Sequence, residues 1–169
     1  ALASYAPALL RPLGVRVSIY PAKGVTVTVP DTAWPEGPKV PIIDDTRLFG
    51  LIRLGNRFRA SGSVEFNGFD TSINPARAEA IVNNVISVFP EFSKCYDRSS
   101  AKVWAGLRPM PSSGNPYVGA TTVKNLYLNC GHGHLGWTLA CGSSQLLADV
   151  VSGRRPAIDM TGLTPATHQ

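Results

Sequence analysis

The chain has 169 residues, a formal net charge of +5 and an isoelectric point near 9.4, and 44% of its residues are hydrophobic. Only 16% of the residues are charged, against roughly 25% in typical globular domains, while 16 glycines and 14 prolines predict many turns. This composition excludes a disordered chain and a coiled coil, and no apolar stretch reaches the roughly 18 residues of a transmembrane helix.

The first half of the chain is predicted to be mostly β-structure. A short helix over 1–11 is broken at Pro7 and Pro12. Six runs of alternating or β-branched residues then predict strands, at 15–20, 25–29, 40–43, 47–54, 57–61 and 63–66. We expect a turn at 21–24 and a loop over 30–38, and the dipeptide Gly55-Asn56 is typical of a β-hairpin.

The second half adds two helices. The first is predicted over 75–89, because Asn74 suits the N-cap and Pro75 the first helical position. Its apolar stripe consists of Ala78, Ile81, Val82, Val85 and Phe89. Strands at 103–107 and 125–129 flank a loop over 109–116, and the second helix runs over 135–152 with Gly153 as its C-terminal cap. This order predicts an α+β fold, with a largely antiparallel β-sheet, helices on one face and a C-terminal helix.

The distribution of charge and the number of cysteines bear on two further classes, nucleic-acid-binding proteins and disulfide-rich secreted proteins. The basic residues are scattered along the chain, and the adjacent pair Arg154 and Arg155 suits a helix end, so we expect no nucleic-acid partner. Three cysteines, Cys95, Cys130 and Cys141, are an odd number. They indicate small buried thiols in a reducing compartment rather than a disulfide framework. The chain does not begin with Met, and we expect it to be a piece of a longer protein.

Residues 131–136 read Gly-His-Gly-His-Leu-Gly, between a predicted strand and a predicted helix. A dinucleotide site also needs a second parallel strand that ends in an acidic residue. Only 33 residues follow Gly136, and the nearest acid, Asp149, lies within the predicted helix, so we reject that reading. Two readings stay open, namely an electron-rich ligand at the helix start or tight packing of the helix on the sheet. Gly142 inside the helix costs about 1 kcal/mol against alanine, so we expect something to press on its backbone.

A zinc site is the other possible interpretation of this region. Cys130, His132, His134 and Cys141 are ligand types that zinc accepts. Their spacing fits no known zinc pattern, and we expect no metal.

Several longer motifs resemble one protein family. They read WAGLRPM (104–110), GNPYVG (114–119) and NLYLNCGHGHLGWTLACG (125–142), with YPAKG (20–24) and RLGNRFRASG (53–62) upstream and Ser152, Gly153, Arg154 and Pro156 near the end. Together they span roughly residues 15–158 and resemble the C-terminal part of D-amino-acid oxidase-like FAD-dependent oxidoreductases, in particular the small subunits of bacterial D-amino-acid dehydrogenases.

The resemblance implies two domains with different functions. In that family a Rossmann-like domain binds FAD, and an antiparallel-sheet domain covers the flavin and holds the substrate. Residues 1–130 correspond to part of the substrate domain, and 131–169 to the flavin-contacting glycine loop, the C-terminal helix and a tail. The Rossmann FAD domain has no counterpart here, so we expect FAD in the complete protein and not in this chain alone.

The resemblance also implies a reaction and a set of site residues. The reaction is oxidative deamination of a D-amino acid by hydride transfer from the α-carbon to flavin N5, with no catalytic acid or base expected in this chain. Arg108 matches the family's carboxylate-binding arginine, whose planar fork suits a carboxylate. The implied substrate-binding residues are Arg108, His134 and Tyr117, and the implied cofactor-binding residues are Gly131, His132, Gly133, Leu135, Gly136, Trp137 and Thr138.

Further expectations concern individual side chains and backbone groups. Backbone N–H groups of Gly133, Leu135 and Gly136 are expected to face the flavin. Tyr20, Lys23 and Tyr117 either line the active face or are structural. Trp104 and Trp137 are expected to anchor packing, and both histidines of the loop either lie near the flavin or only shape the loop.

This chain departs from the family pattern at three places. An acidic residue is lost at 111–116, His134 stands where threonine is usual, and Val25 replaces a tyrosine. An alternative function is therefore a non-catalytic folded remnant, or a binding or assembly module that does not bind flavin on its own.

The expected partners are a small-molecule D-amino acid and the missing FAD-binding half of the chain or an equivalent partner. A second copy, joined through the exposed flavin-facing surface, is also expected, which makes the protein a homo-oligomer. We expect a cytoplasmic location, with a peripheral position on the inner membrane of a bacterium as the alternative.

Overall fold

The computed structural model describes residues 2–164, and the chain divides into two compact units. The central unit is Lys23–Gly106, and the terminal unit comprises the chain up to Ala22 and from Leu107 onward. Two long strands, β1 (Ile19–Pro30) and β5 (Lys102–Pro111), contribute residues to both units.

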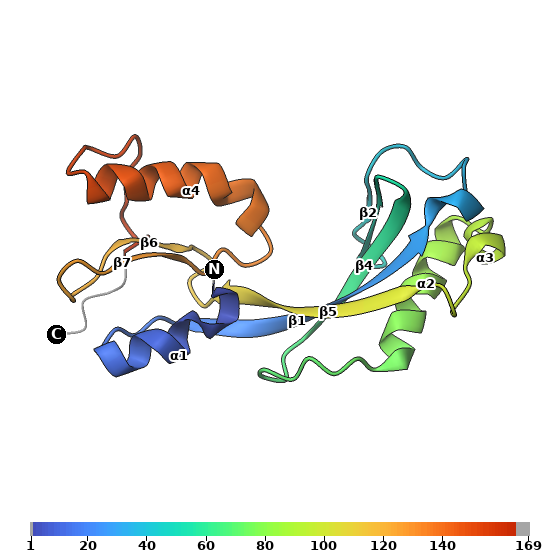
Figure 1. The fold of residues 1–169 in the computed structure, drawn as a ribbon, viewed down its shortest axis with the longest axis horizontal. Coiled ribbons are helices and arrows are strands. Elements are labelled where there is room, and N and C mark those ends of the chain that lie inside the picture. The colour runs from blue at the N-terminus through green and yellow to red at the C-terminus, as the bar shows by residue number, and fades with distance from the viewer. Residues whose placement is uncertain (1, 165–169) are drawn as a thin grey trace. The chain divides into compact units, whose positions relative to one another are not determined.

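The main sheet has five strands in the order β2-β3-β4-β1-β5 (Figure 1). Its members besides β1 and β5 are β2 (Ile42–Asp44), β3 (Phe49–Leu54) and β4 (Arg57–Glu65). The neighbours β2 and β3, β3 and β4, and β4 and β1 all pair antiparallel. The hairpin predicted at Gly55-Asn56 joins β3 to β4, and the predicted α+β class with an antiparallel sheet is confirmed.

Strand β1 differs from the sequence prediction. Residues 15–20 and 25–29 were expected to form two strands with a turn at 21–24, whereas one strand runs without interruption from Ile19 to Pro30. Pro21 lies outside the stretch that pairs with β4, which begins at Lys23, so its missing N–H breaks no bond of that ladder. The irregularity lies instead on β4, where the register shifts opposite Lys23 and Val25, and Ser63 adopts a left-handed φ of 63°.

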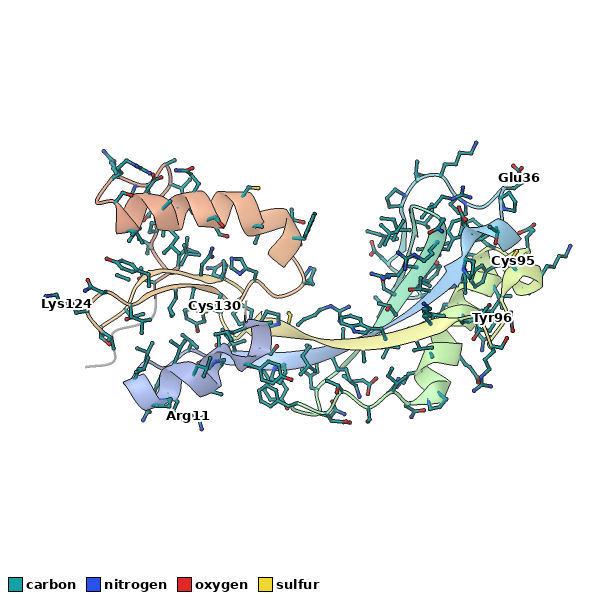
Figure 2. All side chains as sticks on the ribbon, in the orientation of Figure 1. Arg11, Glu36, Cys95, Tyr96, Lys124 and Cys130 are labelled. Carbon is teal, nitrogen blue, oxygen red and sulfur yellow. The ribbon has the colours of Figure 1, made fainter. Side chains whose placement is uncertain are left out.

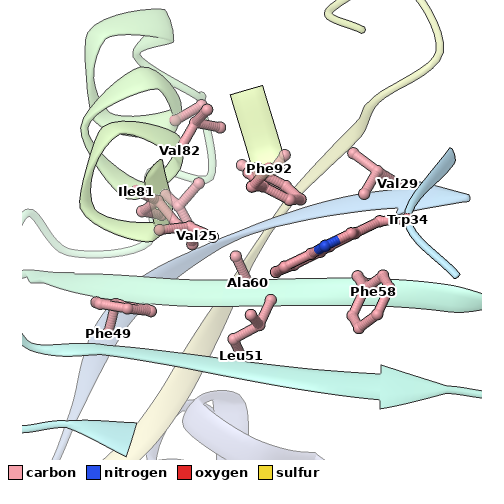
Figure 3. Packing of buried hydrophobic residues seen from close by; sticks show 13 residues of the cluster. Val25, Val29, Trp34, Phe49, Leu51, Phe58, Ala60, Ile81, Val82 and Phe92 are labelled. Carbon is pink, nitrogen blue, oxygen red and sulfur yellow. The ribbon is translucent and has the colours of Figure 1, made fainter. Parts of the chain in front are cut away.

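The core of the central unit combines aliphatic side chains with a group of aromatic rings around Trp34 (Figure 3). The Trp34 ring lies 5.0 Å from the ring of Phe58 and 5.4 Å from that of Phe92. Helix α2 (Pro75–Val88) adds its predicted stripe, of which Ala78, Ile81, Val82 and Val85 are buried, and Phe89 is partly buried where the helix ends. The side chain of Asn74 accepts a hydrogen bond from Ala76 N, which confirms the predicted N-cap. The short helices η3 (Asp31–Ala33) and α3 (Phe92–Cys95) were not expected, and Phe92 inserts into this core.

Lys23 is buried within the central unit and fully paired there. Its Nζ lies 3.2 Å from Glu65 Oε2 and 3.6 Å from Asp70 Oδ2, and it donates to the Ser72 carbonyl at 2.9 Å. Only 2% of the side chain is exposed. These contacts tie the segment after β4 to β1 and support the structural reading of Lys23.

The terminal unit is built around a two-stranded ribbon of β6 (Tyr117–Ala120) and β7 (Tyr127–Cys130). Helix α4 (Gly136–Val151) lies on one side of the ribbon, and α1 (Ala6–Leu10), between the 3-10 turns η1 (Ala3–Tyr5) and η2 (Arg11–Leu13), lies on the other (Figure 1). Its small core contains the buried residues Ala6, Leu10, Val15 and Leu128. Lys124 marks the tip of the ribbon, and Cys130 marks the end from which the chain turns toward α4 (Figure 2). Strand β6 was not predicted, and β5 extends into the segment expected to be a loop over 109–116.

Two expectations about side chains are wrong. Trp104 is 63% exposed and Trp137 is 96% exposed, so neither anchors a core within the described part of the chain, and Trp34 does so instead. The three cysteines are free thiols as expected, but Cys141 is exposed rather than buried.

The functional boundary expected between residues 130 and 131 concerns which residues face the flavin, and it stays a prediction. Over residues 2–164, no helix combines the length and the apolar character needed to span a membrane.

Candidate active site

The glycine loop, residues 131–135, joins β7 to α4 within the terminal unit. Gly131 has a φ of 77° and Gly133 a φ of 58°, a left-handed conformation that strains any residue with a side chain. A Cβ at Gly133 would also lie 3.2 Å from Met110 Sδ, and one at Gly131 would lie 3.2 Å from Ile19 Cδ1. Glycine at both positions therefore avoids backbone strain and close contacts with the neighbouring strands.

Two of the amides expected to face a ligand are already used inside the chain. The N–H of Gly133 donates to the Pro109 carbonyl at 3.0 Å, and the N–H of Leu135 donates to the His132 carbonyl at 3.0 Å. The expectation that these two amides are free donors is therefore wrong. The bond to Pro109 also fastens the loop to β5, directly beside Arg108.

Backbone donors without an acceptor among residues 2–164 are expected instead at the start of α4. The N-cap residue Leu135 makes no side-chain capping bond. In any α-helix the first N–H groups have no acceptor within the helix, and in α4 these belong to Gly136, Trp137 and Thr138. The same end carries the positive pole of the helix dipole, so this terminus suits an electron-rich group.

The next turns of α4 have no charged residue, and the side chains at 137–142 are exposed. From Gly136 to Ala148 the helix has no charged residue, and Trp137 is almost fully exposed. Nothing among the described residues lies within 4 Å of a Cβ built at Gly142. The sequence-based expectation that something presses on the Gly142 backbone is therefore not met within this chain.

Arg108 is half-buried on β5. Its Nη1 atom is buried and has no hydrogen-bond partner within residues 2–164. Burial lowers the pKa of the Arg108 guanidinium, but an arginine stays charged at any physiological pH. An unmet buried donor costs about 1–3 kcal/mol, and a carboxylate is the planar anion that best matches a guanidinium.

Tyr117 lies at the base of the glycine loop. Its phenolic oxygen accepts a hydrogen bond from the Ser18 N–H at 3.1 Å, and its ring packs against the small core. A Cβ at Gly131 would lie 3.3 Å from Tyr117 Cδ2, so the ring also supports the loop. The hydroxyl keeps its own proton, which it can donate to a further acceptor.

The two histidines of the loop differ in their surroundings. His132 is half-buried, its Nε2 lies 3.1 Å from Ser143 Oγ, and burial lowers its pKa. His134 is exposed. The structure thus brings Arg108, Tyr117 and the glycine loop into one region of the terminal unit, with His132 turned toward α4.

Sequence reasoning did not assign a role to three residues of this region. Pro109 accepts the loop amide, Met110 packs under Gly133, and Ser143 holds His132. Only the first two could have been found from the sequence, because they adjoin Arg108. Ser143 is eleven positions from His132, and no local pattern connects them.

The thiol of Cys130 is not a candidate nucleophile. Burial raises its pKa to about 11, so it stays protonated near neutral pH. Within residues 2–164 no group of three or more His, Cys, Asp or Glu side chains is arranged to hold a metal ion.

The chain matches one family model and is similar to curated proteins along most of its length. The family model described as FAD dependent oxidoreductase (DAO) matches residues 1–150. The D-amino acid dehydrogenase of Xanthobacter autotrophicus is 44% identical over 168 residues, which is 99% of this chain and 39% of that protein. The D-amino acid dehydrogenase of Methylobacterium radiotolerans is 47% identical over 158 residues, which is 94% of this chain and 37% of that protein. The chain thus spans about two fifths of the length of these curated relatives.

Solved structures share the fold at lower identity. Glycine oxidase from Geobacillus kaustophilus superposes with a TM-score of 0.84 at 21% identity, covering 99% of this chain and 44% of that one. L-proline dehydrogenase from P. horikoshii superposes with a TM-score of 0.80 at 15% identity, covering 98% of this chain and 45% of that one. At such identities the likeness concerns the fold alone.

Proposed function

The chain belongs to the FAD dependent oxidoreductase (DAO) family, and on this premise we propose that it forms the substrate side of a D-amino acid dehydrogenase. The complete protein would oxidise a D-amino acid to the imino acid by hydride transfer from the α-carbon with loss of an amine proton. Bound FAD would supply the acceptor atom N5, and water would then hydrolyse the imino acid to the keto acid and ammonia. The observation that carries the proposal is the buried Arg108 Nη1, which has no partner within residues 2–164.

Arg108 holds the substrate carboxylate. Its unmet donor gains a charge-assisted partner when a carboxylate binds, and the fork fixes the plane of that carboxylate. A fixed carboxylate orients the α-carbon–hydrogen bond, and a hydride donor needs such orientation more than it needs an acid or a base. His134 on the glycine loop and Tyr117 on β6 at the base of that loop complete the substrate-binding set, His134 as an exposed ring and Tyr117 through its hydroxyl proton.

The start of α4 would hold the flavin in the complete protein. The N–H groups of Gly136, Trp137 and Thr138, together with the helix dipole, would stabilise negative charge on an electron-rich ring. Gly131, His132, Gly133 and Leu135 hold these donors in place through the loop bonds to β5 and within the loop. The donor set of this terminus therefore fits a flavin, and the glycine loop acts as its support.

The flavin and the rest of its site come from outside this chain. The amide of Gly133 is bonded to β5, so the glycine loop does not offer the open cradle that a pyrophosphate needs. We therefore propose that the 169-residue chain alone binds FAD weakly and has no activity. The outward, uncharged face of α4 around Trp137 is where the FAD-binding half of the protein, or a second copy of this chain, packs.

Two measurements on the isolated chain test this partner proposal. A titration with FAD should show no sub-micromolar binding, and tight binding would contradict the proposal. Light scattering should show a dimer or a higher oligomer, because large exposed apolar surfaces associate. A monodisperse monomer would argue against the self-association.

Arg108 provides the decisive test of function in the full-length enzyme. Arg108→Ala removes an interaction of about 3 kcal/mol, and about 1.4 kcal/mol corresponds to tenfold in rate. We expect kcat/KM for D-amino acids to fall at least a hundredfold at unchanged flavin content. Arg108→Lys should recover part of the loss, because it keeps the charge without the fork.

Steady-state kinetics with a dye acceptor, beside the flavin absorbance ratio, measures both effects. Arg155→Ala, at an exposed arginine of the same unit, is the matched control and should change neither. A loss smaller than about fivefold, or a loss that tracks flavin depletion, would mean that Arg108 is structural.

A further inference from the structure

Ser143 makes a buried polar contact between α4 and the glycine loop. The residue is 6% exposed, on a helix whose neighbouring positions Gly142 and Ser144 are exposed. Its Oγ lies 3.1 Å from His132 Nε2 and 3.4 Å from the Ala140 carbonyl one turn earlier in the same helix. A side chain of α4 therefore contacts the imidazole of His132.

The protons of this contact can be assigned from the donors and acceptors present. A serine hydroxyl has one proton to donate and two lone pairs to accept with. Within a helix that proton is commonly donated to a carbonyl three or four residues earlier, which here is the carbonyl of Ala140. With that donation the lone pairs of Oγ face His132, Nε2 is the donor of the 3.1 Å contact, and Nδ1 of the neutral ring carries no hydrogen.

We propose that Ser143 is a positioning residue for His132, whose ring it holds in one orientation as the Nε2–H tautomer. The inference rests on the proposed function, because Ser143 acts through the loop that precedes the flavin-facing terminus of α4. The burial that lowers the pKa of His132 favours the same neutral ring.

The position of the contact explains how it reaches the site. The His132 carbonyl accepts a hydrogen bond from the Leu135 N–H. A Cβ built at Gly136 would lie 3.5 Å from His132 Cβ. His132 therefore touches the two residues at which α4 begins. Fixing its ring fixes the first turn of the helix, where the donors for the flavin lie.

The test uses the full-length, FAD-loaded enzyme with histidine labelled with nitrogen-15. The ring signal of His132 is assigned by its loss in His132→Gln, and its shifts report the tautomer. We expect the Nε2–H form in the unaltered enzyme and a mixture of tautomers in Ser143→Ala. Loss of one buried hydrogen bond corresponds to about fivefold, so FAD affinity and kcat should each fall by about that factor. KM for the D-amino acid should change less than about twofold, because Arg108 holds the carboxylate.

Two further variants separate positioning from packing. Ser143→Thr keeps the hydroxyl and should restore both the tautomer and the FAD affinity. Ser144→Ala, at the exposed neighbouring serine, is the matched control and should change nothing.

The inference is overturned by an Nδ1–H tautomer of His132 in the unaltered enzyme, which is read directly once the ring signal has been assigned. It is also overturned if Ser143→Ala leaves the tautomer and FAD affinity unchanged, or if Ser143→Thr restores neither. Failure of the proposed function is a separate result, because it is read from Arg108→Ala kinetics rather than from the His132 ring.

Discussion

The central and terminal units each contain a tryptophan and a buried or half-buried cation whose surroundings differ. In the central unit Trp34 is 8% exposed and packs among aromatic rings, whereas Trp137 of the terminal unit is 96% exposed. The buried cation of the central unit, Lys23, has two acidic partners, whereas the half-buried Arg108 of the terminal unit has a donor with none within residues 2–164. The central unit thus pairs its buried cation within the chain, whereas the terminal unit leaves the Arg108 donor and the exposed Trp137 for other molecules to contact.

The tryptophan pair provides the largest expected difference in stability. Trp34→Ala in the 169-residue chain should lower the free energy of unfolding by about 3–5 kcal/mol, because it opens a cavity in the core. Trp137→Ala should change it by less than about 0.5 kcal/mol. Urea denaturation followed by circular dichroism measures both. Equal losses would mean that Trp137 is packed in solution and that the contrast between the units is wrong.

The buried ion pair of the central unit gives the second effect. Lys23→Met leaves Glu65 without its cation and should lower the free energy of unfolding by about 3 kcal/mol. Adding Glu65→Gln to that variant should recover part of the loss, since no buried charge then lacks a partner. The exposed pair Arg98 and Glu79 is the control, and Arg98→Met should cost less than about 0.5 kcal/mol. A similar cost for Lys23 and Arg98 would show that burial does not distinguish them.

Arg108 gives the smallest effect, and of the opposite sign. Arg108→Met removes a buried donor with no partner and keeps the apolar stem, so it should raise the free energy of unfolding by about 1 kcal/mol. The same substitution in the full-length enzyme should abolish most of the activity. Thermal unfolding of the isolated chain measures the first effect. A clear loss of stability would indicate that Arg108 has a structural partner in solution and would weaken its assignment to the substrate.

Local sequence patterns predicted the elements whose causes are local. Asn74 caps α2 because an Asx side chain reaches the amide two residues on, and the stripe from Ala78 to Val85 follows from helical spacing. The Gly55-Asn56 turn joins its two strands because a two-residue loop suits a hairpin. The family is likewise a property of the sequence, because the motifs that carry the resemblance are contiguous runs of residues.

Only the tertiary structure decided which groups find partners. The run 19–30 is a single strand that pairs with β4 only from Lys23 onward, so the missing N–H of Pro21 breaks no bond of that ladder. Which tryptophan is buried depends on the rings around it, not on the residue itself. The amide of Gly133 and the ring of His132 are engaged by Pro109 and Ser143, which lie on other elements. Hydrogen bonds and packing join atoms that are near in space, and spacing along the chain reports such nearness only within a helix, a strand or a turn.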